Sequence, residues 1–339
     1  MSTRAQPPAA GPWRVTLVTN PDDCNLACPM CAFGASRPPG PPRRMAPALA
    51  AAVLREAAGR GLAEAIPSTM GEPLLWAGMD GLVDLCAALG VALNVTTNGT
   101  FPGRGAAAWA ARLVPVASDV KVSWNGATAR TAEAIMPGLP FDRAVANVAA
   151  LVAARDAAAR AGRRRCRVSF QVTAQEANVA ELAGIVRLAA SLGVDRVKVN
   201  QLQVRAPALA PLSLRRDAAA IRRWNAAVAG ARLAAVEARL PGGGQVLLQN
   251  VAPLAEDPAA PAPTGACPFV GREAWVHADG RFAPCPHPAA QRGELGDFGS
   301  VAERGLLAVW AGPGFRAFVA GYEAHPVCRE CPFRRMGGA

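Results

Sequence analysis

The sequence lacks the features that would place it in a membrane or outside the cell. None of its 339 residues belongs to an uncharged apolar run long enough to span a bilayer, which takes about 20 residues. Residues 1–12 hold several prolines but no apolar stretch of a signal peptide. We therefore expect a cytoplasmic protein with no membrane partner, in which the nine cysteines bind metal, react or pack instead of forming disulfides.

Lysine and aromatic residues are scarce, and this argues against a nucleic-acid partner. The net charge is +11, yet only Lys121 and Lys198 are lysines and aromatics make up 5% of the chain. The arginine clusters at 163–165, 215–216 and 222–223 fall in helical or helix-flanking segments with few aromatics nearby. A solvated basic face, shaped by a coding bias, explains them better than a nucleic-acid surface. Modification of a nucleic acid stays an alternative, which salt-dependent tRNA binding would test.

Apolar periodicity predicts alternating strands and helices along residues 13–250, after a flexible tail at 1–12. Such repeats indicate parallel β/α units wound in one hand. We expect strands at 13–19, 63–69, 91–97, 119–124, 165–173, 194–204 and 245–248, and helices at 47–60, 79–89, 106–113, 141–161, 179–192 and 214–238.

Polar and apolar residues alternate within the predicted strands, as in Lys121, Ser123 and Asn125 beside Val120 and Val122. Because side chains of a strand point to opposite faces, one face of the sheet is apolar and the other polar. A closed eight-stranded barrel would instead fill its interior with apolar layers. The pattern favours an open, hollow (β/α)6 partial TIM barrel; the alternative is that polar residues occupy only the strand ends.

The composition changes after a connector predicted at residues 251–265, which is rich in proline and alanine. Residues 266–339 contain four cysteines, all three histidines and a predicted hairpin at 273–283 that turns at Asp279-Gly280. We expect a small, separate metal-binding domain here, built from a β-hairpin and a helix.

Three cysteines, Cys24, Cys28 and Cys31, form a C-x3-C-x2-C motif just after the first predicted strand. Three thiolates can hold three irons of a [4Fe-4S] cluster and leave the fourth iron open, because such clusters otherwise take four cysteines. A structural zinc site is the alternative, but it requires four ligands, and no further cysteine or histidine lies within about thirty residues.

This motif resembles the signature of the radical SAM superfamily. The resemblance implies that S-adenosylmethionine binds the open iron, and that one electron from a flavodoxin- or ferredoxin-type donor cleaves it to a 5′-deoxyadenosyl radical. Met70-Gly71-Glu72-Pro73 resembles the family's Gly-Gly-Glu-Pro element, with Met70 in place of the first glycine; Glu72 would suit the cofactor's ammonium group and Gly71 would let the backbone approach it.

The resemblance implies further cofactor contacts, placed by their order along the chain. Met30 stands where the family often has an aromatic residue near the adenine, and a thioether can fill that contact. Contacts to the ribose and the methionyl carboxylate would come from Thr96, Asn98, Ser123 and Asn125, and the adenine would meet residues 172–175.

Cys267, Cys285, Cys328 and Cys331 form a second set, with the pattern C-x12-G-x4-C followed by C-x2-C. The layout resembles the Twitch version of the SPASM accessory domain, which implies one auxiliary [4Fe-4S] cluster; a zinc ribbon is the alternative. The count of ligands excludes two auxiliary clusters. The remaining candidates are expected to be structural: polar residues at His277, His287 and His325, packed thiols at Cys86 and Cys166, and a helix-entry loop at 103–108.

By this resemblance the chain is expected to abstract hydrogen from a substrate and to oxidise the substrate radical through the auxiliary cluster, as in dehydrogenation of a small molecule. A maturase that cross-links or epimerises a ribosomally made peptide is a near-equal alternative. Only twelve residues precede Trp13, with no leader-binding extension among them, which tilts the expectation to a small molecule or a separately delivered peptide. A non-catalytic metal-binding scaffold is the alternative from another class.

Overall fold

The computed structural model describes residues 10–31, 40–68, 70–204, 206–255, 265–331 and 333–334. Four expectations therefore fall outside the described residues in whole or in part: the tail at 1–9, Thr69 at the end of the second predicted strand, the connector at 256–264 and the last residues from 335. Within the described part, no helix is both long enough and apolar enough to cross a membrane.

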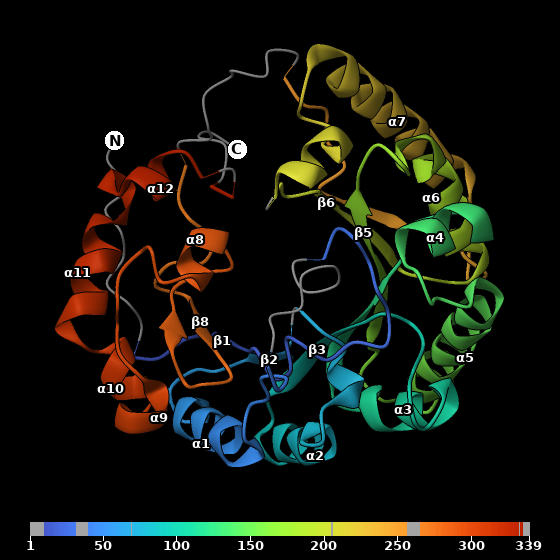
Figure 1. Ribbon diagram of the computed structural model, residues 1–339. Helices are drawn as coiled ribbons and strands as arrows, with labels where there is room; N and C mark the ends of the chain where they lie inside the picture. The colour runs from blue at the N-terminus through green and yellow to red at the C-terminus, as the bar shows by residue number, and fades with distance from the viewer. Residues whose placement is uncertain are drawn as a thin grey trace.

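Six parallel strands form the open partial barrel that the sequence predicts (Figure 1). Each strand pairs with the next one along the chain, and a seventh short strand extends the far edge. Most strands are shorter than predicted, whereas β4 begins two residues earlier than predicted. They are β1 Arg14–Leu17, β2 Glu64–Pro67, β3 Ala92–Thr97, β4 Ala117–Ser123, β5 Arg167–Ala174, β6 Arg196–Gln201 and β7 Leu247–Gln249.

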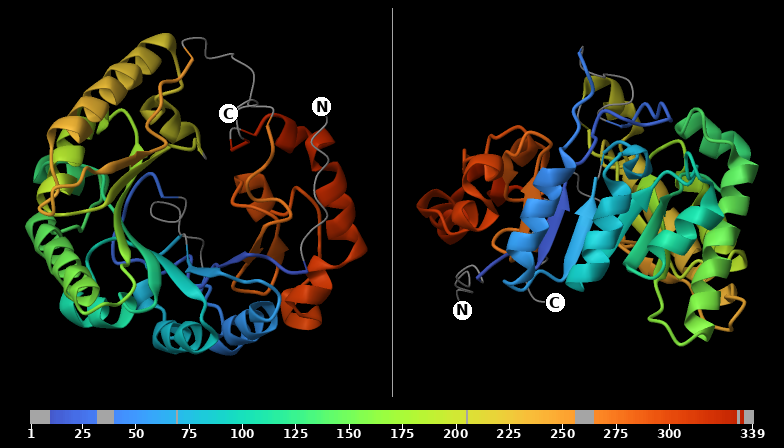
Figure 2. Two further views of the ribbon diagram at one scale, coloured as in Figure 1. Left: turned by 180° about the vertical axis from the view of Figure 1, so that it is seen from behind. Right: turned by 90° about the horizontal axis from the view of Figure 1, so that it is seen from below.

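The helices of this domain cover the outside of the curved sheet, as both face-on views show (Figures 1 and 2). The two helices predicted at 79–89 and 106–113 have the predicted bounds. One short helix was not predicted; it begins where the Thr128 hydroxyl accepts a hydrogen bond from the Thr131 amide. The helices are α1 Pro47–Ala58, α2 Met79–Leu89, α3 Ala106–Leu113, α4 Ala129–Ile135, α5 Phe141–Arg160, α6 Leu182–Ser191 and α7 Ala218–Glu237, with short 3-10 turns η1 Pro73–Leu75, η2 Val179–Glu181 and η3 Pro207–Leu212.

Apolar side chains of the strands pack outward against these helices and leave the polar ones on the inner face. Trp124 and Phe170, for example, stack 4.5 Å apart and are both buried. Polar residues lie in mid-strand on the inner face, as Lys121 and Ser169 do, and not only at strand ends. The hollow barrel predicted from the alternation is therefore confirmed.

The C-terminal residues continue the barrel's sheet, which the sequence did not predict. The hairpin predicted at 273–283 is present, but its first strand pairs in parallel with β1, so that one nine-stranded sheet runs through both parts. Arg14 of β1 bridges Glu64 and Glu273 on either side, each at 2.6 Å. The elements are β8 Glu273–Val276, β9 Phe282–Ala283, α8 Pro288–Gln291, α9 Val301–Arg304, α10 Leu306–Trp310, α11 Pro313–Gly321, η4 Tyr322–Ala324 and α12 Pro326–Arg329.

Candidate functional site

The first cysteine motif lies on the loop that leaves the carboxyl end of β1. Its three thiols are half-buried, and the Cys24 sulfur accepts hydrogen bonds from the Leu26 amide at 3.4 Å and from Asn98 Nδ2 at 3.6 Å. Burial and the neighbouring thiols raise the pKa of Cys28 to about 12. A bound cation reverses this effect, because a coordinating thiol loses its proton outright. The loop thus offers three thiols that a bound cluster would deprotonate.

Two ion pairs brace this loop, and sequence reasoning missed both. Arg43 binds the buried Asp22 at 2.8 Å, and Arg44 binds Asp23 at 2.5 Å. The sequence shows two aspartates before the first cysteine and two arginines twenty-one residues later. No local pattern in the sequence indicates that they form ion pairs. Only the tertiary structure brings these charges together.

Gly71 and Glu72 pack directly against the start of the cysteine loop. The Glu72 amide donates to the Asp23 carbonyl at 2.7 Å, and the Asn20 side chain donates to the Glu72 carbonyl at 2.8 Å. Gly71 has φ of +74°, and a Cβ there would lie 2.1 Å from the Asn20 carbonyl oxygen. The glycine thus permits the contact between the two loops; its approach to a cofactor stays a prediction.

The Glu72 carboxylate is fully buried and joins η1 to the end of β3. It accepts hydrogen bonds from the Leu74 amide at 3.2 Å, the Thr97 hydroxyl at 2.9 Å and the Asn98 amide at 2.6 Å. Burial nevertheless raises the pKa of Glu72 to about 7. These contacts place Glu72 as a residue that positions Asn98 beside Cys24, while direct contact with an ammonium group stays a prediction.

The remaining residues predicted to contact the cofactor differ in whether their side chains already make hydrogen bonds within the protein. Among the described residues, the half-buried hydroxyls of Thr96 and Ser123 make no hydrogen bond, so both can receive a ligand. Asn125 is buried and already engaged, because its Oδ1 accepts from the Thr173 amide at 2.8 Å. Met30 is half-buried and packs against the core. All four contacts with the cofactor stay predictions, as do those of residues 172–175.

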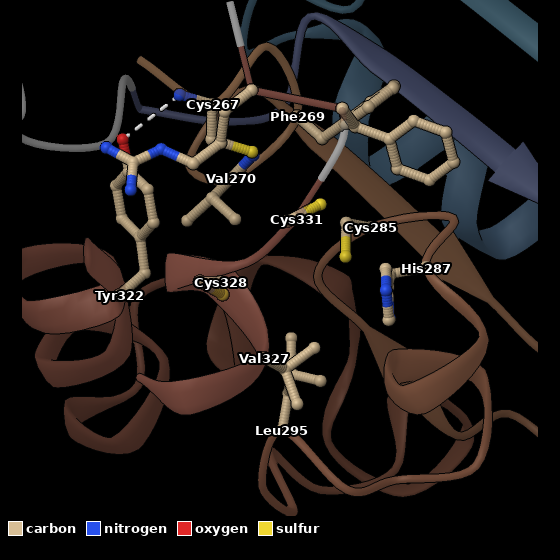
Figure 3. Close-up of a pocket in the computed structure, with 12 residues that line it drawn as sticks. Cys267, Phe269, Val270, Cys285, His287, Leu295, Tyr322, Val327, Cys328 and Cys331 are labelled. Atoms are coloured by element: carbon tan, nitrogen blue, oxygen red, sulfur yellow. Dashed lines mark hydrogen bonds between the residues drawn. The ribbon is translucent and has the colours of Figure 1, made fainter. Parts of the chain in front are cut away.

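The second set of cysteines meets in one cavity of the C-terminal part (Figure 3). Cys267 precedes β8, Cys285 follows β9, and Cys328 and Cys331 come from α12 and its end. Burial raises the pKa of the Cys285 and Cys328 thiols, the latter to about 11, and the neighbouring thiols add to the effect. Four thiols from three segments thus line one small space, as a saturated cluster requires.

Two His-Pro pairs and the single tyrosine shape this cavity. His287 and His325 each accept a hydrogen bond from the amide two residues on and so cap α8 and α12, where a proline occupies the first helical position. His287 also lines the cavity. The Cys267 amide donates to the Tyr322 hydroxyl at 3.1 Å (Figure 3). His287 and His325 thus cap helices, a role that the sequence analysis missed, whereas the role expected for His277 stays a prediction.

The other candidates from the sequence lie in the core or in loops. All nine cysteines are free thiols; Cys86 and Cys166 are fully buried, as expected. Gly105 precedes α3 in the expected helix-entry loop. In the part of the chain that the structure describes, no three Cys, His, Asp or Glu side chains are grouped so that they could hold one metal ion. The candidate sites for iron–sulfur clusters are the loop with three thiols and the cavity with four thiols.

Comparison with known proteins identifies two domains. Residues 21–158 match the model of the radical SAM superfamily, and residues 267–332 match that of the SPASM family, an iron–sulfur cluster-binding domain. The first match contains Cys24, Cys28 and Cys31, and the second contains all four cysteines of the other set. No curated protein matches the chain in sequence.

Solved structures share the fold at low identity. SuiB of Streptococcus suis bound to S-adenosylmethionine superposes with a TM-score of 0.67 and 14% identity, covering 96% of this chain and 73% of SuiB. SuiB bound to the precursor peptide SuiA gives 0.64 and 16%, covering 92% and 67%. The protein anSMEcpe with bound AdoMet gives 0.65 and 13%, covering 95% and 85%. The chain therefore contains a radical SAM domain at residues 21–158 and a SPASM iron–sulfur cluster-binding domain at residues 267–332, and it shares its fold with these solved structures.

Proposed function

We propose that the protein oxidises a peptide substrate by radical SAM chemistry and that its SPASM domain accepts an electron from the substrate. When bound, the first cluster and S-adenosylmethionine supply removal of a hydrogen atom, and the auxiliary cluster supplies electron transfer. The substrate would thus lose two hydrogens. The first leaves as a hydrogen atom; the second leaves as a proton, and its electron passes to the auxiliary cluster.

The difference in thiol number between the two sites carries this proposal. Cys24, Cys28 and Cys31 would hold the first cluster and leave one iron for the cofactor, whereas the four thiols of the cavity would saturate the second cluster. A saturated cluster has no iron for a substrate, so electron transfer or a structural role remains for it. Glu72 and Asn98 would fix the first loop, and the free hydroxyls of Thr96 and Ser123 would bind the cofactor.

The substrate class is supported by structures with the same fold. SuiB has been solved with the precursor peptide SuiA bound, and anSMEcpe has been solved with AdoMet and the Kp18Cys peptide bound. A small metabolite, which was the first expectation from the sequence, stays the alternative substrate class. A peptide is therefore the substrate class that we propose for this chain.

Anaerobic reconstitution tests the chemistry. The wild-type protein with S-adenosylmethionine and dithionite should form 5′-deoxyadenosine and bind about eight irons. The Cys24/Cys28/Cys31→Ala variant should form none and retain about four irons, whereas Cys86→Ala, which changes a buried core thiol, should behave as the wild type. Wild-type protein that binds its iron but forms no 5′-deoxyadenosine would instead indicate the non-catalytic scaffold.

A candidate peptide tests the substrate class. A short open reading frame beside the gene would supply it, and incubation with the reconstituted enzyme should yield a product lighter by two hydrogens. The Cys267/Cys285→Ala variant should still consume S-adenosylmethionine but release no oxidised peptide. Oxidised peptide from that variant would contradict the role given to the SPASM domain.

A further inference from the structure

The only two lysines of the chain lie on the inner face of the barrel, in the middle of β4 and β6. The strand β5 separates them, and its register places Ser169 beside Lys121 and Gln171 beside Lys198. Strands two positions apart are about 10 Å apart. Because each lysine has a flexible four-carbon stem, both ammonium groups can reach one ligand between them.

The two lysine side chains are unpaired within the part of the chain that the structure describes. Among the described residues, Lys121 and Lys198 make no hydrogen bond and no ion pair, although Lys121 is only 9% exposed. Burial lowers the pKa of both amines, that of Lys121 to about 8. Repulsion by Lys198 adds to the effect on Lys121, and repulsion by Arg196 and Arg14 adds to the effect on Lys198. An ammonium group that is buried without a partner destabilises the fold. A bound anion would offset this cost.

The other charges that face the lysines are already paired. Arg14 binds Glu64 and Glu273, and Arg196 binds Asp119. Asp119 also accepts a hydrogen bond from the Ser169 hydroxyl at 2.8 Å. These paired groups are the ones whose charges act on the lysines. Two arginines against three carboxylates give the layer one net negative charge, and the two amines are its unpaired cations among the described residues.

The charge count of this inner wall favours a singly charged ligand. Four cations, Arg14, Arg196, Lys121 and Lys198, face three carboxylates, those of Glu64, Asp119 and Glu273, which leaves one net positive charge. A single carboxylate balances that charge, whereas a phosphate group would carry more negative charge than the wall offsets. Gln171 Nε2 adds a donor, because it is buried between the two lysine strands without a partner among the described residues.

Lys121 lies deeper in the barrel than Ser123, one of the groups proposed for the cofactor, whereas Lys198 lies level with Ser123 through Gln171. Ser123 comes two residues after Lys121 on β4, which places it about 7 Å nearer the carboxyl end of the sheet. We propose that Lys121 and Lys198 bind a carboxylate of the peptide substrate, from an Asp or Glu side chain or from its C-terminus. The inference rests on the proposed function and specifies the peptide as one that presents an acidic group to the interior of the barrel.

Competitive amine labelling of the reconstituted holoenzyme tests this inference, because the two lysines and the N-terminus are the only amines. Trace acetylation would be measured by mass spectrometry with and without each peptide. S-adenosylmethionine would be present in both samples, so that any protection by its own carboxylate is the same in both. The probes are Ac-Ala-Glu-Ala-NH2, Ac-Ala-Gln-Ala-COOH and the uncharged Ac-Ala-Gln-Ala-NH2. At ten times its Kd, a carboxylate peptide should slow the labelling of both lysines about tenfold.

The three probes separate the possible results. Protection by the glutamate peptide assigns the site to an acidic side chain, and protection by the free-acid peptide assigns it to a C-terminus; either result supports the proposal. Equal protection by the uncharged peptide, or no protection by any peptide, overturns it. Complete protection by S-adenosylmethionine alone also overturns it, because the lysines would then belong to the cofactor site.

Substitution provides the second measurement. Lys121→Gln and Lys198→Gln should each weaken binding of the protecting peptide about tenfold or more, the loss typical of a hydrogen bond to a charged group. Arg187→Gln, on the outer helix α6, removes the same charge from an exposed side chain and should not change binding. Iron content at the wild-type value checks that the lysine variants fold; peptide binding unchanged in both would overturn the proposal.

The outcomes for the two proposals are distinguishable. Labelling and binding require no turnover, so they report on the lysines even if the enzyme forms no 5′-deoxyadenosine. Conversely, formation of 5′-deoxyadenosine and oxidised peptide without protection of the lysines would leave the proposed function standing and remove the carboxylate site.

Discussion

Gly71 is the residue at which the first cluster loop tolerates least change. In Gly71→Ala the new Cβ would overlap the Asn20 carbonyl oxygen, 2.1 Å away, and the φ of +74° disfavours any side chain. We expect the loop to shift and the first cluster to be lost, so that iron per reconstituted chain falls by about half. Gly81→Ala is the matched control, since nothing lies within 4 Å of a Cβ there. Equal iron in both variants would contradict this role.

Glu72 gives the folded protein a pH dependence that its amide analogue lacks. Its pKa is about 7 in the fold, because of burial, against an ordinary value of 4.5. Between these values the folded state holds a proton that the unfolded state has lost, so stability falls as the pH rises through this window. The shift corresponds to about 3 kcal/mol.

Denaturant unfolding of the wild type and of Glu72→Gln at pH 5 and pH 8 measures this contribution. The wild type should lose up to about 3 kcal/mol more than the variant between the two pH values. The difference between the proteins removes the contribution of all other titrating groups. Parallel losses in the two proteins would show that Glu72 ionises with an ordinary pKa.

At the scale of elements, a buried network of an ion pair and hydrogen bonds connects α5 to β5 and to the loop before β6. Arg155 of α5 is 2% exposed, binds Asp195 and donates to the Gly193 carbonyl at 2.9 Å. Asp195 in turn accepts from the Val168 amide at 2.8 Å, at the start of β5. The helix, the loop before β6 and β5 therefore share a single carboxylate.

Arg155→Met tests this network. It leaves a buried carboxylate with one partner fewer, and we expect it to lower the free energy of unfolding by about 3–5 kcal/mol. Arg187→Met is the control, because Arg187 is exposed and lies 3.9 Å from the exposed Glu237; a change of about 0.5 kcal/mol or less is expected there. Chemical denaturation measures both, and similar values would refute the assignment.

At the scale of the whole molecule, the SPASM domain and the barrel share one sheet. Strand β8 pairs with β1 over four residues, and Arg14 bridges the buried Glu64 and Glu273 across the join. The Glu56 carboxylate of α1 adds a second link, since it accepts hydrogen bonds from the Leu306 and Leu307 amides at the start of α10. The auxiliary cysteines are thus fixed relative to the first loop.

Arg14→Met should loosen this join. Two buried carboxylates would remain side by side without their shared cation, at a cost of about 3–5 kcal/mol. Hydrogen exchange should quicken in β8 and β1 while β4 and β5 keep their protection. Arg272→Met, at an exposed neighbouring arginine, is the control and should leave exchange unchanged. Uniform exchange across the sheet in Arg14→Met would show that the join does not depend on Arg14.

The sequence alone was sufficient for the parts of this protein that depend on local spacing. The order of strands and helices follows from apolar periodicity, and the hollow barrel follows from the alternation around Lys121 and Lys198. The spacing of seven cysteines predicts two cluster sites, and four of these cysteines line one cavity. Each of these patterns lies within a few tens of residues, where backbone geometry alone relates one side chain to the next.

Only the tertiary structure decided which distant groups meet. The pairing of Arg14 with Glu273, of Asp22 with Arg43 and of β8 with β1 joins segments whose separation along the chain carries no signal of contact. The two lysines look in sequence like remnants of a coding bias, yet the barrel places them on the same inner face. Contacts of this kind depend on the assembly of the whole sheet, because the position of each strand depends on all the strands between it and the sheet edge.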